Sequence, residues 1–160
     1  MKILVISDTH IPRVAHDLPD KIYEEIPNVD MIIHAGDFVE KEIYNKLKKL
    51  KPIKAVFGNM DSSDLRNILN QKEVIEIEKV RIGLVHGHGA PSDLVDTVRG
   101  QFSDVDAIVF GHSHAALNIK KNDVLFFNPG SPTDNIFAKS NSYGVLEVSG
   151  KKIEGRIIKL

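Results

Sequence analysis

The sequence predicts a single α/β domain in which a mixed sheet, or two packed sheets, is flanked by helices. Short apolar runs of strand length alternate with helical patterns through the first two-thirds of the chain. The last third instead carries paired apolar runs joined by short polar turns, which is typical of antiparallel hairpins. The 160 residues are 42% apolar and 27% charged, and no Pro/Gly/Ser-rich linker divides them. We therefore expect one globular domain over residues 1–160.

The first part of the chain predicts alternating strands and helices. Three apolar runs have the length of buried strands: residues 3–6, 29–33 and 53–57. Two sets of apolar residues at helical spacing separate these runs: Leu18, Ile22 and Ile26, then Ile43, Leu47 and Leu50. Pro27 and Pro52 follow the two sets and are expected to end the helices.

The rest of the chain predicts hairpins with one helix among them. The expected hairpin arms pair residues 74–77 with 82–85, 117–119 with 124–127, and 143–148 with 153–158. Ser92 is a good N-cap for a helix that carries Leu94 and Val98. Residues 105–110 form one more apolar run, which predicts a buried strand.

Composition and charge exclude several classes of function. The absence of cysteine excludes disulfides, thiolate metal sites and a cysteine nucleophile. A net charge of −1 gives no general attraction to nucleic acid or anionic membrane, and 6% aromatic residues without tryptophan provide no stacking platform for single strands. No signal-peptide pattern and no apolar run near the length of a membrane span is present, so a cytoplasmic protein is expected.

Polar residues suited to metal binding follow five of the predicted strands. The five segments are Asp8-Thr9-His10, Gly36-Asp37, Gly58-Asn59, His86-Gly87-His88 and Gly111-His112-Ser113-His114. Because the carboxyl ends of parallel strands converge at one edge of a sheet, we expect these side chains to lie close together. The glycines that precede three of the segments allow sharp turns and close approach. The sequence therefore predicts a cluster of two carboxylates, one amide and several imidazoles.

Such a cluster predicts bound cations, because carboxylates and imidazoles gathered at a strand edge would otherwise lose hydration without compensation. Oxygen and nitrogen ligands without sulfur suit Mn²⁺, Fe²⁺, Zn²⁺, Ni²⁺ or Co²⁺. Seven ligands are too many for one tetrahedral ion but suit two ions about 3.5–4 Å apart that share a carboxylate. The expected metal ligands are Asp8, His10, Asp37, Asn59, His86, His112 and His114. His34, within an apolar run, and His16, in a proline-containing loop, are interpreted as structural.

These five segments resemble the five motifs of the calcineurin-like metallophosphoesterases. The small size and the Asn128-Pro129-Gly130-Ser131 segment are similar to the compact bacterial and archaeal phosphodiesterase branch of that superfamily. The resemblance implies a sandwich of two mixed β-sheets flanked by α-helices. It also implies one metal held by Asp8, His10, Asp37 and His114, and another held by Asp37, Asn59, His86 and His112, with Asp37 bridging the two.

One position departs from the pattern of many family members, although the compact branch commonly shares the departure. The residue after the Gly58-Asn59 pair is Met60 rather than histidine, and methionine can neither donate a proton nor pair with phosphate. His88 or Asp61 could take over the catalytic role of that histidine, and His88 could equally support a metal ligand. Asn59 is expected to give its carbonyl oxygen to a metal and its amide hydrogen to a phosphate oxygen.

The resemblance implies a metal-dependent phosphoesterase, above all a phosphodiesterase, that hydrolyses a small phosphoester with a hydroxide bridging two divalent ions. Manganese is the favoured metal, with nickel, iron, zinc or cobalt as alternatives. Because no obvious general acid is present, we expect activated substrates, first aryl phosphodiesters and second phosphomonoesters. The loops over residues 11–17, 60–71 and 131–142 should set specificity. Asn135, Lys139 and Asn141 either reach the site or belong to a polar loop.

Two other functions are found among proteins that resemble this fold. A non-catalytic protein-binding scaffold with the same fold, as in the scaffold subunit of the retromer coat, would be expected to have lost metal ligands, whereas all seven are present here. A nuclease related to DNA-repair metallophosphoesterases would need additional DNA-binding segments that 160 residues do not accommodate. A homo-oligomer is compatible with the sequence.

Overall fold

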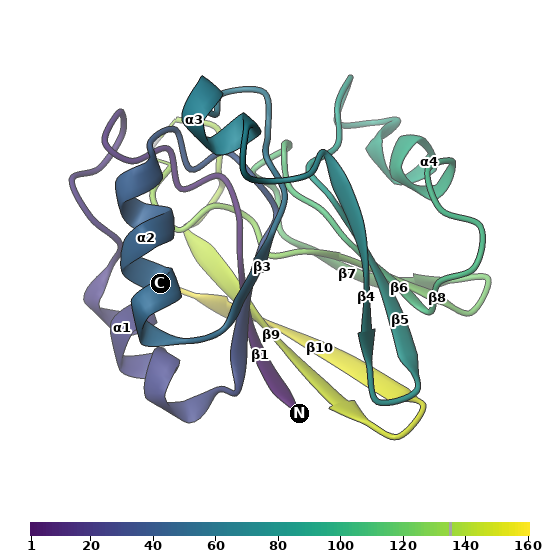
Figure 1. Ribbon diagram of the computed structural model, residues 1–160. Coiled ribbons are helices and arrows are strands. Elements are labelled where there is room, and N and C mark those ends of the chain that lie inside the picture. The colour runs from purple at the N-terminus through teal and green to yellow at the C-terminus, as the bar shows by residue number, and fades with distance from the viewer. Residues whose placement is uncertain (135) are drawn as a thin grey trace.

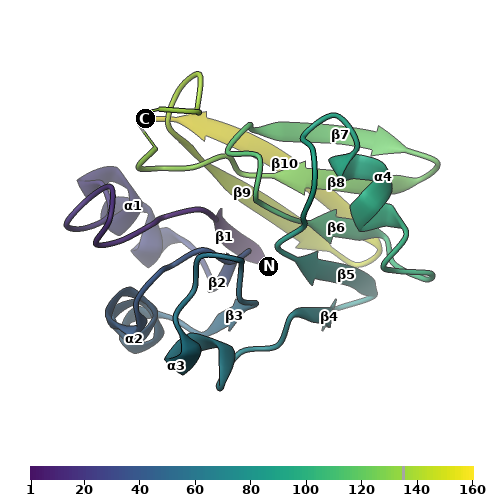
Figure 2. The ribbon, with the colours of Figure 1, turned by 90° about the horizontal axis from the view of Figure 1, so that it is seen from above.

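The computed structural model describes residues 1–134 and 136–160 and shows two five-stranded mixed sheets packed face to face, with helices on their outer faces (Figures 1 and 2). The first sheet has the order β10-β9-β1-β2-β3 and the second has the order β4-β5-β6-β8-β7. The predicted fold class is therefore confirmed. No described helix is long and apolar enough to span a membrane.

The elements have the following bounds. The first sheet contains β1 (Lys2–Ile6), β2 (Met31–His34), β3 (Ile53–Ala55), β9 (Ser142–Ser149) and β10 (Lys152–Lys159). The second sheet contains β4 (Lys72–Ile77), β5 (Val80–Val85), β6 (Ala107–Val109), β7 (Leu117–Lys121) and β8 (Val124–Asn128). The helices are α1 (Asp20–Glu25), the short 3-10 helix η1 (Ile26–Asn28), α2 (Lys41–Leu50), α3 (Ser63–Arg66) and α4 (Leu94–Arg99).

Each sheet contains three neighbouring parallel strands. These are β1, β2 and β3 in the first sheet, and β5, β6 and β8 in the second. In Figure 1 the strands β1, β3 and β5 rise toward the top of the molecule. The segment after β6 reaches the same rim, because the His112 N–H donates to the Asp8 carboxylate. The predicted hairpins β4–β5, β7–β8 and β9–β10 add the antiparallel strands. Six parallel strands therefore end at a single rim, and the polar segments follow them there.

Three apolar layers hold this arrangement together. Ile3 and Val5 of β1 pack between the two sheets, whereas Leu4 and Ile6 face the layer under α1 and α2. A third layer lies between α4 and the outer face of the second sheet. Because both faces of β1 are buried, its sequence is continuously apolar rather than alternating.

Three details differ from the sequence-based expectations. α4 begins at Leu94 with Asp93 in the cap position, and the Ser92 hydroxyl donates to the Asp93 carboxylate instead of capping the helix. Leu50, expected on the buried face of α2, is 47% exposed because the helix ends there. The short helix α3 was not predicted, since its four residues carry too little periodicity to be recognised.

Candidate metal centre

The predicted ligands sit on turns that leave the strands with a left-handed backbone. Five of them have positive φ angles: Asp8 (55°), His10 (46°), Asp37 (60°), His112 (70°) and His114 (55°). Such conformations are uncommon for residues other than glycine, and they collect at functional sites where the surrounding structure enforces them. The turns direct these side chains back across the strand ends rather than out into solvent.

The turns approach one another so closely that only glycine fits at positions 58 and 111. A Cβ atom on Gly58 would overlap the Asp37 carboxylate, and one on Gly111 would overlap the Ser7 hydroxyl. The Gly111 Cβ would also lie 2.6 Å from Asp8 Oδ2. Both glycines therefore make room for the two buried carboxylates.

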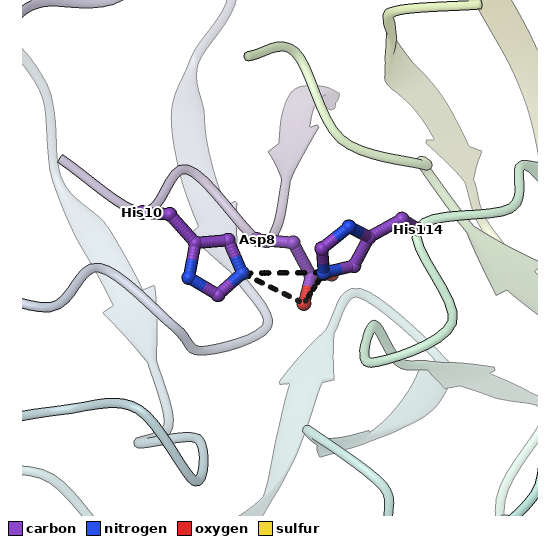
Figure 3. A group of neighbouring side chains, drawn as sticks. All are labelled: Asp8, His10 and His114. Atoms are coloured by element: carbon purple, nitrogen blue, oxygen red, sulfur yellow. Dashed lines mark hydrogen bonds and ion pairs between the residues drawn. The ribbon is translucent and has the colours of Figure 1, made fainter. Parts of the chain in front are cut away.

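One side of the centre is formed by Asp8, His10 and His114 (Figure 3). The ring nitrogens His10 Nε2 and His114 Nε2 lie 3.2 Å apart, and Asp8 Oδ1 lies 3.9 Å and 3.4 Å from them, respectively. Figure 3 shows both rings turned toward the same carboxylate, although they come from opposite sheets. Three potential ligands thus point at one volume.

The other side is formed around His86. Its Nε2 atom lies 3.3 Å from Asp37 Oδ2, 3.9 Å from Asp8 Oδ1 and 3.2 Å from Asn59 Oδ1. His112 Nδ1 also lies 3.3 Å from the Asn59 oxygen. Asp37 Oδ2 is 3.7 Å from His10 Nε2, so this carboxylate reaches both sides. The structure brings all seven predicted ligands together.

Hydrogen bonds outside the centre fix the orientation of the rings. His86 Nδ1 lies 2.7 Å from the carbonyl oxygen of Ala35, and His112 Nε2 lies 3.1 Å from that of Gly89. A carbonyl oxygen only accepts, so each of these nitrogens carries the proton and donates it. In the neutral ring the opposite nitrogen, which faces the centre, is then available as a ligand.

Carboxylates hold two of the imidazoles in their charged form. Burial alone would lower the pKa of His86, but the hydrogen bond to Asp37 and the charges of Asp8 and Asp37 raise that pKa to about 9. Burial is likewise outweighed at His114, where Asp8 and Asp134 raise the pKa to about 9. The same pairs lower the pKa of Asp8 and of Asp37 below the usual value, against the effect of their burial.

Sequence reasoning missed Asp134, the carboxylate that orients His114. Its Oδ2 atom lies 2.6 Å from His114 Nδ1, and its side chain is almost fully buried. The preceding residues fasten the turn after β1, because the Ser131 and Thr133 hydroxyls donate to the carbonyl oxygens of Asp8 and Thr9, each at 2.7 Å. The useful signal was position, since this segment follows β8 as the predicted ligands follow other parallel strands.

Two of the candidate catalytic residues, Asp61 and His88, lie in different environments. Both oxygens of the buried Asp61 carboxylate accept backbone N–H groups: Asp37 and Gly58 donate to one, and Val39 to the other. Asp61 is therefore a structural clamp on the turns that carry Asp37 and Asn59. His88 is exposed and lines a small pocket of about 170 Å³ beside Asn59.

Three other polar residues singled out in the sequence, His34, Lys139 and Asn141, lie outside the ligand cluster. His34 is buried, accepts the Gly36 N–H at Nδ1 and lies 3.2 Å from the Thr9 hydroxyl, so its structural interpretation is confirmed. Burial keeps the pKa of His34 well below its usual value. Lys139 is exposed, and the Asn141 carbonyl accepts the N–H of Leu160. Asn135 lies outside the described residues.

A model of the calcineurin-like phosphoesterase superfamily domain matches residues 1–151. The chain belongs to this superfamily. It is 41% identical over 136 residues to a probable metallophosphoesterase of Methanocaldococcus jannaschii, a match that covers 83% of this chain and 69% of the relative. It is also 30% identical over 144 residues to a protein of the same organism named as a phosphodiesterase. That match covers 81% of this chain and 83% of the relative.

Solved structures show the same fold. A protein of Thermotoga maritima, determined in solution by NMR, is 35% identical and matches with a TM-score of 0.77 over 99% of both chains. Vacuolar protein sorting 29 of Entamoeba histolytica, solved with Zn²⁺, is 26% identical and also matches with a TM-score of 0.77 over 99% of both chains. The predicted family and fold are confirmed, and the chain is a metal-dependent phosphoesterase.

The donor set fits the divalent metals of this superfamily. Asp8, His10 and His114 form one group, and Asp8, Asp37 and His86 form another, with all ligand atoms of a group within 4.8 Å of one another. Carboxylate and imidazole ligands together suit borderline divalent cations. Two overlapping groups that share a buried carboxylate are difficult to explain as packing alone, because burying these charges is costly without a cation.

Proposed function

We propose that the chain is a binuclear metal-dependent phosphodiesterase that acts on small phosphoesters, and that its catalytic domain comprises all 160 residues. The observation that carries this proposal is the position of Asp37, whose Oδ2 atom lies 3.7 Å from His10 Nε2 and 3.3 Å from His86 Nε2. One carboxylate oxygen can thus serve two adjacent ligand groups. The extent of the domain is supported by β10, which pairs with β9 and completes the first sheet.

The ligands divide between two sites as follows. Asp8, His10, Asp37 and His114 would hold one ion, and Asp37, Asn59, His86 and His112 would hold the other. We favour Mn²⁺, with Ni²⁺, Fe²⁺, Zn²⁺ or Co²⁺ as alternatives. When bound, the two ions would supply a water activated as nucleophile and positive charge for the phosphoryl oxygens.

The residues of the chain position the substrate and the ligands. Asn59 has its Oδ1 atom between His86 and His112, which leaves its amide N–H groups directed elsewhere and able to donate to a phosphate oxygen. Asp8 is fixed because the His112 N–H donates to its carboxylate at 3.0 Å. Asp61 keeps the Asp37 and Asn59 turns in place through its three backbone hydrogen bonds.

Among the residues that the structure describes, no side chain is fixed in the role of general acid. Met60 cannot donate a proton, and the Asp61 carboxylate is occupied by backbone donors. We assign to exposed His88, at the edge of the pocket beside Asn59, the contact with the leaving group or the substrate. Substrates with good leaving groups, such as aryl phosphodiesters, should therefore be hydrolysed fastest.

Replacing Asp37 with asparagine tests the bridging role. We expect bound metal to fall from two ions per chain to one or none, and turnover of an aryl phosphodiester to fall by at least about 100-fold, because a shared ligand affects both ions. Metal analysis and a steady-state assay measure the two effects, with His16→Ala as a control on an exposed histidine outside the centre. Full activity with a single ion per chain would show that the bridging role is wrong.

The alternative is a non-catalytic protein-binding scaffold, which the structural likeness to vacuolar protein sorting 29 favours. The complete ligand cluster supports the enzyme instead. Turnover of an aryl phosphodiester with added Mn²⁺, abolished by a chelator and restored by the metal, distinguishes the two functions. A chain that binds metal but turns over no phosphoester under these conditions would support the scaffold.

A further inference from the structure

A pocket of about 610 Å³ opens above the candidate metal centre. Its floor includes His10, Asn59 and His114, while its walls come from loops after β1, β3 and β8. Pockets that bind small molecules commonly have volumes of roughly 300–1,000 Å³. This space is therefore large enough for a substituent attached to a phosphate at the centre.

The walls of the pocket are apolar and exposed. Ten large hydrophobic side chains are exposed among the described residues, and four of them line this pocket: Val14, Met60, Ile136 and Phe137. Ile136 is 75% exposed and Phe137 is 76% exposed, which makes them the most exposed of the ten. Apolar side chains that gather around a cavity, rather than scatter singly, mark a binding surface.

The loop that presents Ile136 and Phe137 is held in place by the centre itself. The Asp134 carboxylate accepts the backbone N–H groups of Ile136, Phe137 and Ala138 and also contacts His114 Nδ1. The Phe137 ring stands edge-on to the His114 ring, with centroids 5.9 Å apart. The apolar wall is thus preorganised next to a predicted metal ligand, and binding need not order it.

The pocket also has a positively charged side chain, that of Arg13. Arg13 lines its wall and is exposed. A phosphodiester carries one negative charge, so a guanidinium near an apolar wall complements an anion that has an apolar substituent. Met60 contributes its apolar side chain to the wall of the pocket and cannot transfer a proton.

We propose that this pocket is a subsite for an aromatic or bulky apolar ester group of the phosphodiester substrate, with Ile136 and Phe137 setting the preference. The proposal rests on the proposed phosphodiesterase function. An aromatic ring on the Phe137 side chain would bury apolar surface on both partners. Small alkyl phosphodiesters would leave this wall exposed to water.

Two unreactive anions test the subsite without turnover. Diphenylphosphinate and dimethylphosphinate share the tetrahedral monoanionic head of a phosphodiester but have no ester bond to hydrolyse. We expect calorimetry on the Mn²⁺-loaded chain to show at least about tenfold tighter binding of diphenylphosphinate. In Ile136→Ser and Phe137→Ser, that ratio should fall toward one while the affinity for dimethylphosphinate is unchanged.

The matched control is Ile119→Ser, an exposed isoleucine on β7 outside the pocket, which should keep the wild-type ratio. Equal affinities for the two anions, or no binding of diphenylphosphinate at millimolar concentration, would overturn the subsite. So would loss of the preference in the control, or a changed oligomeric state as the main effect of Phe137→Ser. A retained preference for the diphenyl anion without turnover of any phosphoester would instead refute the proposed activity alone.

Discussion

The two sheets contribute different chemistry to the same rim. The parallel strands of the first sheet lead to the oxygen donors Asp8, Asp37 and Asn59, whereas those of the second lead to the imidazoles His86, His112 and His114. His10 is the imidazole that the first sheet adds to this rim, and Asp134 is the carboxylate that the second sheet adds. The centre therefore exists only where the sheets pack together. The polar side chains of the first sheet form an anionic row, and the imidazoles of the second form a basic row that faces it across the interface.

This division explains how the site is stabilised without metal. Each row would carry like charges or polar groups without partners if it were buried alone. Together, the carboxylates hold the pKa of His86 and the pKa of His114 at about 9, so protonated imidazoles offset the anions at neutral pH. Metal binding must displace these protons, which makes affinity for metal increase with pH.

The largest expected effect comes from removing the anion that both imidazoles share. Asp8→Asn deletes the negative charge 3.4 Å from His114 Nε2 and 3.9 Å from His86 Nε2. We expect turnover to fall by at least about 100-fold, as for loss of a metal ligand or its close support. In the metal-free variant, NMR titration should show the pKa of His114 well below its wild-type value. An unchanged pKa of His114 would show that the carboxylates of the first sheet do not hold this imidazole in its charged form.

A smaller effect is expected at Asp134, the carboxylate that the second sheet contributes to the rim. Asp134→Asn retains the shape of the side chain but removes its charge from His114 Nδ1, and we expect affinity for one metal ion to fall by roughly 10–100-fold. Binding of the other ion, next to His86, should change little because that ring is oriented by the Ala35 carbonyl. Equal weakening of both ions in a metal titration would contradict this difference. Asp17→Asn, on the exposed surface, is the control.

The smallest effect is a pH dependence of stability. The folded-state pKa values of His86 and His114, about 9, exceed the ordinary 6.5, so their contribution is complete below about pH 6.5 and is lost as pH rises through 9. We expect the Tm of the metal-free chain to fall by on the order of 5 °C across that range. With metal bound, the cations replace the protons and the decrease should largely disappear. Calorimetric scans at several pH values measure this, and a Tm that rises from pH 6.5 to 9 in the metal-free chain would contradict it.

Much of this arrangement was accessible from the sequence because local chemistry dictated it. The apolar run of residues 3–6 has the length of a buried strand and was interpreted as one, and polar segments after five such runs predicted one shared rim. Boundaries were less accurate. Ser92 was the expected N-cap of α4, but Asp93 occupies the cap position, and the Ser92 hydroxyl donates to the Asp93 side chain.

Other features arose only from packing. Nothing local distinguished Asp61 as a clamp rather than an acid, since its role depends on backbone N–H groups of Asp37 and Val39, more than 20 positions earlier in the chain. Asp134 likewise gained its role from a contact with His114, 20 residues away. The apolar wall of Ile136 and Phe137 was also beyond prediction, because exposure is a property of the folded surface.

The sequence by itself determined which residue types arrive at the ends of the strands, since hydrophobic runs and turn residues are encoded locally. Only the tertiary structure decided which of them meet, because packing one sheet on the other sets the distance from each imidazole to each carboxylate. That distance governs the charge of His86 and His114, the reach of Asp37 to both sides and the pocket above them. Electrostatic interaction and hydrogen bonding depend on separation in space, which no position along the chain specifies.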